Sequence, residues 1–534
     1  MAVQSLFFTF FDDHKGQSLL WSRSKRQQNL DGVELQALPS GLHLVNRDTY
    51  YFRRTEPSST TDSAEEKSQL GTVVFRNREL TPEEVERAGG EGKTRGRLMI
   101  GLGALSRIQD TNIHFTSLSP LEQAIDAISR EWKVERTEEE RQRWLDDMLD
   151  PVWETIIQDN SGAGEPETGD AQDRPELASA LGVTPDNPIE SLVLLSQTLG
   201  VSLLSLWKYA AAGRRILFYG SPPLTSICQA AYCTWLASLR LSELQQRPIS
   251  TYLGMIGLTD MSAVASLPHG WVACTSDAIY KDKTGIFDLL VDCSGSDILP
   301  SEYDETVNPA REPVMRAVVR EKGQVSLKYL TYTYSDTVFW NAIAPLLTAQ
   351  STDSQKSDLS HTSIWRSAKG TYTYICDICW GLCAFATGTA YSHSAGHADH
   401  ARGFIRLPTD DQPATISDDG DSIEDDEGQG SADTSPESGD TRSLCAIQIL
   451  KILDHRRDHI EQRLAQSVRD AGATSLSNED MRKMGLSAWS WVDVEFVRGL
   501  HRLRRTEPVS TGTIGSGLEV ERRWFRRAMG LVGL

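Results

Sequence analysis

Helical segments alternate with short buried strands in the middle of the chain, and this alternation limits the fold more than any other feature. Apolar residues recur at helical spacing over Leu192–Ala211 and over Thr225–Leu241. Short apolar runs, typical of strands buried on both faces, occur at Arg215–Tyr219, Trp271–Cys274 and Ile286–Val291. Helices that alternate with buried strands favour an α/β layer.

The N-terminal region is predicted to begin with a β-hairpin. Leu6–Phe11 is an apolar run, Asp12–Gly16 has the composition of a turn, and Ser18–Trp21 supplies the second strand. Further short strands are predicted at Gly71–Phe75 and Arg97–Leu102. The N-terminal region is therefore predicted to contain at least four short strands.

Helices follow these strands. Leu121, Ile125, Ile128 and Trp132 are spaced by four, three and four residues, as on one face of a helix. A second helix is predicted through Trp144, Met148 and Trp153. Gly101 and Gly103, which follow a predicted strand, lack the third glycine of a dinucleotide-binding fingerprint, so we interpret them as a tight turn.

Changes in composition divide the rest of the chain. Val314–Tyr334 has the pattern of a hairpin, whereas Thr409–Asp440 contains 12 acidic residues and no Lys or Arg. Such an acidic segment cannot bury enough apolar surface to order itself. We therefore predict a first module at 1–158 with a flexible insert at 54–69, a linker at 159–185, a central α/β module at 186–348, a linker at 349–370, an uncertain Cys- and His-containing segment at 371–408, a disordered acidic linker at 409–441 and a helical C-terminal region at 442–534.

Charge limits the kinds of partner. The chain has 54 Lys and Arg against 74 Asp and Glu, a net charge of −20. This balance argues against nucleic acid as a partner, because phosphate contacts require a surplus of basic residues. Ser5–Phe11 is too short for a secretory signal, and Tyr372–Ala390 is too polar to span a membrane. We therefore expect a cytoplasmic protein that can also attach peripherally to endomembranes.

Two further segments suggest binding. Cys376, Cys379 and Cys383 are weak candidates for a zinc site, although free cysteines in an apolar run are more often structural, and no metal or cofactor is predicted. The segment Leu518–Leu534 reads as a basic amphipathic helix that could lie on a membrane or pack on the body of the protein. No spacing typical of a catalytic residue set is present.

Several phrases, taken in order, resemble DENN-domain proteins. Three groups of residues resemble the upstream part of that family: Phe11–Gly16 with Trp21, Leu38–His43 with Asp48 and Tyr51–Phe52, and Val74–Arg78. Three further segments resemble its central part: Ile216–Pro223, Trp271–Asp277 and Phe287–Asp292. The combination resembles the LCHN-like branch, in which a C-terminal domain of unknown function, similar here to Ser487–Leu503, follows the DENN unit.

This resemblance implies a longin-like upstream (uDENN) module, a central three-layer α/β DENN module and a helical C-terminal part. It also implies guanine nucleotide exchange on a Rab-type small GTPase in vesicle traffic, without catalytic residues. A trafficking scaffold that binds small GTPases, coat proteins or tethers without exchange is the alternative. The loops after the strands are the candidate contacts, although turn geometry alone could explain some of them: Asp12, Asp13, Lys15, Tyr219, Ser221, Thr275 and Asp277.

Overall fold

The computed structural model describes most of the two α/β regions and part of the C-terminal region. The described residues are 3–25, 28–55, 68–87, 95–109, 112–159, 186–241, 248–267, 270–294, 298, 313–321, 324–348, 437–471, 475–504 and 519–520. None of the helices in these ranges is long and apolar enough to cross a bilayer.

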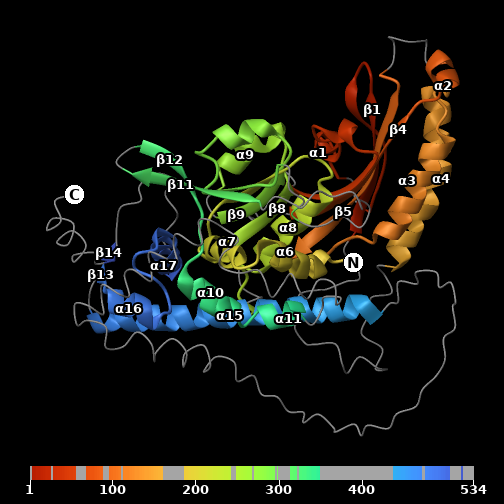
Figure 1. Cartoon of the computed structure of the whole chain (residues 1–534). Helices are drawn as coiled ribbons and strands as arrows, with labels where there is room; N and C mark the ends of the chain where they lie inside the picture. The colour runs from red at the N-terminus through yellow and green to blue at the C-terminus, as the bar shows by residue number, and fades with distance from the viewer. Residues whose placement is uncertain are drawn as a thin grey trace, which may run out of the picture.

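One large mixed sheet forms the centre of the molecule (Figure 1). Its strands run in the order β12-β11-β10-β7-β9-β8-β3-β4-β5-β1-β2, with β6 beside β5. The N-terminal strands pair antiparallel. They are β1 (Val3–Asp12), β2 (Gly16–Ser24), β3 (Arg47–Thr55), β4 (Ser68–Glu79), β5 (Arg97–Gln109) and β6 (Asn112–Ile113).

The central strands include four that run parallel, because helices connect them across the faces of the sheet. Leu217 and Phe218, like Ala273 and Val272, contribute to hydrophobic clusters on opposite faces, so these strands are buried on both sides. The strands are β7 (Ile216–Tyr219), β8 (Ser250–Met255), β9 (Gly270–Thr275) and β10 (Leu289–Asp292), followed by the antiparallel pair β11 (Val314–Glu321) and β12 (Gln324–Tyr329).

One pair of residues forms the strand pairing between the two halves of the sheet. Phe52 in β3 pairs antiparallel with Gly254 in β8. Gly254 has a φ of 66°, and a Cβ atom there would lie 2.4 Å from the backbone oxygen of Tyr51. Only glycine therefore allows the two backbones to approach so closely.

Helices cover both faces of this sheet. The N-terminal strands are covered by α3 (Leu118–Glu131) and α4 (Glu138–Asp159), visible along one side in Figure 1, and the parallel strands on that face by α6 (Ser191–Leu199), α7 (Ser202–Ala211) and α8 (Thr225–Leu236). The opposite face of the parallel strands packs against α9 (Met261–Ala265) and the 3₁₀ segment η6 (Ala278–Asp282). Short elements connect these layers: α1 (Val33–Ala37), η1 (Leu42–Leu44), α2 (Pro82–Arg87), η3 (Pro188–Glu190), η5 (Leu258–Asp260), α10 (Tyr334–Trp340) and α11 (Ala344–Thr348).

The C-terminal region packs on this α/β body instead of standing apart. The long helix α15 (Glu437–Ala471) runs along the lower side of the molecule in Figure 1 and contacts α6 and α11. Buried Lys208 of α7 lies between Asp336 of α10 and Asp493 of α17, with its Nζ 2.5 Å from Asp336. The remaining elements are β13 (Ser475–Leu476), α16 (Asn478–Lys483), α17 (Trp491–Arg504) and β14 (Glu519–Val520).

The structure confirms the predicted mixed α/β class with a helical C-terminal region. It corrects the interpretation of Gly101 and Gly103, which lie inside β5. A Cβ atom at Gly103 would lie 2.3 Å from the ring of Phe7, so the glycine makes room for a core side chain rather than a turn. The helix predicted over Leu192–Ala211 is two helices separated at Gly200.

Several predicted boundaries also move. Strand β3 ends at Thr55 and strand β4 begins at Ser68, both inside the predicted insert 54–69, because the pairing of the two strands continues to these residues. Helix α15 begins at Glu437, inside the predicted acidic linker, and Glu519–Val520 forms strand β14 beside β13 instead of the start of a helix. The rest of the basic segment, the linker 349–370 and most of the acidic linker lie outside the described residues.

Candidate functional site

The four parallel strands end at one edge of the sheet, which we call the carboxyl edge. Tyr219 at the end of β7 pairs with Thr275 of β9 on one side and Asp292 of β10 on the other. The loop after β7 leads to α8 on one face, whereas the loop after β9 leads to η6 on the opposite face. Ligands of open α/β sheets bind at such a switch point beyond the strand ends.

Antiparallel pairing brings the N-terminal strands to the same edge. Because β3 runs antiparallel to β8, the start of β3 lies near the end of β8. The end of β4, the start of β5 and the β1–β2 turn then follow along the sheet. The seven predicted contact residues, drawn from both halves of the sheet, therefore belong to one edge.

Asp12, Asp13 and Lys15 form the tip of the first hairpin. Asp12 Oδ1 accepts hydrogen bonds from the backbone N–H groups of His14 and Lys15, at 2.8 and 2.9 Å, which fixes the turn. Burial opposes the charged form of Asp12, yet these two bonds lower its pKa below the usual value. Asp13 accepts a bond from the backbone N–H of Arg95, whereas Lys15 is exposed.

Tyr219 and Ser221 follow β7 and differ in accessibility. The ammonium group of Lys281 lies 3.8 Å from the ring centre of Tyr219 and 3.1 Å from Asp292 Oδ2, so η6 is tied to two strand ends. Ser221 is exposed in the loop before α8. Ser221 is therefore accessible to a partner, and Tyr219 is partly covered.

Thr275 and Asp277 are both buried, so they hold the loop after β9 instead of presenting a contact surface. Thr275 Oγ1 accepts a hydrogen bond from the backbone N–H of Asp277, at 3.2 Å. Burial raises the pKa of the Asp277 carboxyl, and its bond with Ser40 opposes that rise. Ser276 Oγ also donates to the backbone oxygen of Ser40, at 2.8 Å.

The loop around α1 and η1 links the two halves at this edge. Gln36 Nε2 donates to Asp260 Oδ1 in η5 at 3.3 Å, and Tyr280 in η6 donates to the backbone oxygen of Gly257 at 2.8 Å. A Cβ atom at Gly41, where φ is 90°, would lie 3.3 Å from the side chain of Pro222. These bonds join α1, η5 and η6 into one surface.

Asp48 connects the start of β3 with the N-terminus of α8. Its carboxylate accepts bonds from the backbone N–H of Leu224 at 2.7 Å and from Thr225 Oγ1 at 2.9 Å. It thus supplies the cap that the first residues of α8 lack within their own segment. Burial raises the pKa of Asp48 to about 6, although these hydrogen bonds favour its charged form.

Four large apolar side chains are exposed on these short elements, and we call them the apolar rim. They project where a water-soluble surface would ordinarily present polar groups, and together they indicate a binding surface. Sequence reasoning missed them because each is a single hydrophobic residue in a loop or short helix, without periodicity. The apolar rim consists of Leu35 (40% exposed), Leu44 (67%), Leu258 (51%) and Ile279 (48%).

Metal-ligating side chains are not gathered at this edge in the part of the chain that the structure describes. Within the described ranges, no group of three His, Cys, Asp or Glu side chains could hold a metal ion. The zinc candidates Cys376, Cys379 and Cys383 lie outside those ranges. What the edge offers is shape, apolar contact and fixed polar loops.

Comparisons with known proteins agree with this architecture. A family model described as DENN domain-containing protein 11 matches residues 6–302. The chain is 24% identical over 292 residues to "DENN domain-containing protein 11" of Xenopus laevis, a match that covers 54% of this chain and 59% of that protein. It is 22% identical over 331 residues to "Uncharacterized protein ANR2" of Saccharomyces cerevisiae, which covers 57% of this chain and 60% of that protein.

The matched region runs from within β1 through β10 and includes the carboxyl edge up to Asp292. The α/β sheet and this match define the class, a DENN-domain protein. Within that class, the chain belongs to the DENN domain-containing protein 11 family. The matches cover less than two thirds of the length of these relatives.

Proposed function

We propose that the chain is a guanine nucleotide exchange factor for a Rab-type small GTPase in membrane traffic, and that it binds the GTPase at the carboxyl edge. The observation that supports this most is the apolar rim. Leu35 of the N-terminal half and Leu258 and Ile279 of the central half are exposed on elements that hydrogen bonds connect. A partner seated there would touch both halves of the DENN region.

Such an activity needs no nucleophile, metal or cofactor. An exchange factor accelerates release of GDP by binding the GTPase more tightly when the nucleotide is loosely held or absent. Each tenfold increase in release rate requires about 1.4 kcal/mol of preferential binding to that state. A rigid surface with apolar contacts and fixed loops is suited to this kind of discrimination.

The test is the release of labelled GDP from a panel of purified Rab-type GTPases, measured with and without the full chain. The proposal predicts faster release from at least one member and tighter binding of its nucleotide-free form. Tight binding of a loaded GTPase without faster release would favour the alternative, a trafficking scaffold. If neither binding nor faster release is observed, both functions are excluded for the panel tested.

A further inference from the structure

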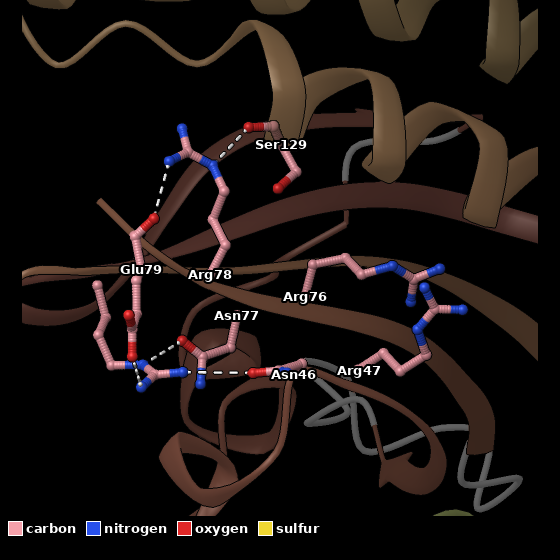
Figure 2. Close-up of a pocket in the computed structure, with 8 residues that line it drawn as sticks. Asn46, Arg47, Arg76, Asn77, Arg78, Glu79 and Ser129 are labelled. Atoms are coloured by element: carbon pink, nitrogen blue, oxygen red, sulfur yellow. Dashed lines mark hydrogen bonds and ion pairs between the residues drawn. The ribbon is translucent and has the colours of Figure 1, made fainter. Parts of the chain in front are cut away.

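A pocket rich in arginine lies beside the apolar rim, at the start of β3 and β5 and the end of β4 (Figure 2). Its volume is about 550 Å³. Ser129 of α3 contributes one wall. The lining combines four guanidinium groups, two amides and one carboxylate: Asn46, Arg47, Arg76, Asn77, Arg78, Glu79, Arg97 and Ser129.

Two of these arginines are balanced by acids that remain ionised. Arg76 Nε lies 2.6 Å from Asp126 Oδ1, and the pKa of Asp126 is lowered mainly by this bond and further by the charge of Arg47. Arg78 makes two bonds of 2.8 Å to Glu84 and lowers the pKa of Glu84 to about 2. Both side chains are thus held in place with their charges compensated.

Arg47 and Arg97 differ from that pair. Arg97 bonds to Asn77 Oδ1 at 2.9 Å and meets the exposed Glu79 at 3.3 Å. Arg47 is exposed and forms no ion pair with any residue that the structure describes. Arg47 pairs with Arg76 across β3 and β4, and Figure 2 shows their guanidinium groups close together. The pocket therefore has a surplus of positive charge at its mouth.

We propose that this pocket binds the phosphomonoester headgroup of an anionic lipid. A guanidinium group matches two oxygens of a phosphate, and several together fit a phosphate better than a carboxylate. Leu44 lies on the same wall, because Asn77 Nδ2 donates to the backbone oxygens of its neighbours His43 and Val45. With a lipid phosphate in the pocket, the exposed Leu44 side chain would reach the boundary between headgroups and acyl chains, where apolar side chains are buried in a bilayer.

The net charge of the chain limits how it can bind an anionic membrane. At −20, the protein as a whole is repelled by an anionic surface. On this face of the α/β body, attraction has to come from a local site that recognises the phosphate group rather than from general charge. The inference does not depend on the exchange activity proposed above.

The experiment is cosedimentation of the full chain with phosphatidylcholine vesicles that contain a phosphatidylinositol monophosphate. Vesicles with phosphatidylserine at the same total charge are the comparison. We expect binding only to the first kind, weakened about tenfold by Arg47→Ala, which removes charge-assisted bonds. Arg442→Ala, an exposed arginine on α15, is the matched control and should bind normally.

A second variant separates the lipid from its soluble headgroup. Leu44→Ser should weaken vesicle binding while leaving the weaker binding of soluble inositol bisphosphate unchanged. Equal binding to phosphatidylserine vesicles, or normal binding by Arg47→Ala, would overturn the proposal. So would inositol bisphosphate binding as tightly as the vesicles with no effect of Leu44→Ser, since the ligand would then be a soluble polyanion.

Discussion

The buried charge of Lys208 links the α/β body to the C-terminal region. Its ammonium group is 2% exposed and lies between Asp336 and Asp493. Burial opposes the charged form, but the two carboxylates together raise the pKa of Lys208. The arrangement joins α7, α10 and α17, so this side chain contributes to holding the C-terminal region on the α/β body.

Lys208→Met is therefore expected to lower the free energy of unfolding by about 3–5 kcal/mol, because two buried carboxylates lose their counter-charge. Urea denaturation measures this loss. Lys483→Met is the control, since Lys483 forms an exposed pair with Glu479 and should change stability by less than about 1 kcal/mol. Similar effects of the two substitutions would contradict the role given to Lys208.

Asp48 makes stability depend on pH in a predictable direction. Its pKa rises from 3.8 to about 6 on folding, so the folded state binds its proton more tightly. The associated stabilisation is complete below about pH 4 and is lost as pH rises through about 6. Relative to Asp48→Asn, the wild type should lose about 3 kcal/mol over this interval, at 1.36 kcal/mol per pKa unit.

Urea titrations of the wild type and Asp48→Asn, at several pH values between about 4 and 7, check this expectation. The difference between the two proteins isolates Asp48 from the other titrating groups. A difference that stays constant across the range would mean that Asp48 is not the group responsible.

Residues of this kind were beyond sequence reasoning. Asp48 appeared only within a family-like phrase, since its partners Leu224 and Thr225 lie about 175 positions away in the chain. Lys208 had no visible signal, because a lone lysine in a helical segment is ordinarily on the surface. The hairpin turn at Asp12–Gly16 was predictable because its hydrogen bonds are local.

At the scale of elements, the contact between β3 and β8 converts two sheets into one. Gly254→Ala should separate these strands, because its Cβ atom would lie 2.4 Å from the Tyr51 oxygen. Gly16→Ala is a matched control: its φ of 79° imposes a similar backbone strain, but nothing lies within 4 Å. We expect Gly254→Ala to be less stable than Gly16→Ala by at least about 2 kcal/mol.

Thermal or urea unfolding of the two glycine variants measures this difference. Equal losses would show that backbone strain alone matters and that the strands can move apart at no further cost. Strands in both halves of the sheet were predictable from local patterns, but the pairing between the two halves was not. A one-residue register contact between strands about 200 positions apart leaves no periodic trace in the sequence.

At the scale of the whole molecule, the α/β class and the helical C-terminal region followed from periodicity and composition. The carboxyl edge could not be predicted in this way, because it depends on the order and direction of the strands across both halves of the sheet. The loops after β1, β7 and β9 were correctly placed in the sequence. The side chains with the largest exposed apolar area there, such as Leu44 and Leu258, became apparent only from the structure.

The carboxyl edge is proposed to bind a small GTPase, and one measurement tests this binding most directly. GDP release from the most responsive GTPase of the panel is compared for the wild type, Leu258→Ser/Ile279→Ser and Leu444→Ser, a control at an exposed leucine of α15. We predict a loss of at least about tenfold for the double variant, from about 1.4 kcal/mol or more of lost apolar contact, and none for the control. Undiminished release by a correctly folded double variant would contradict the claim.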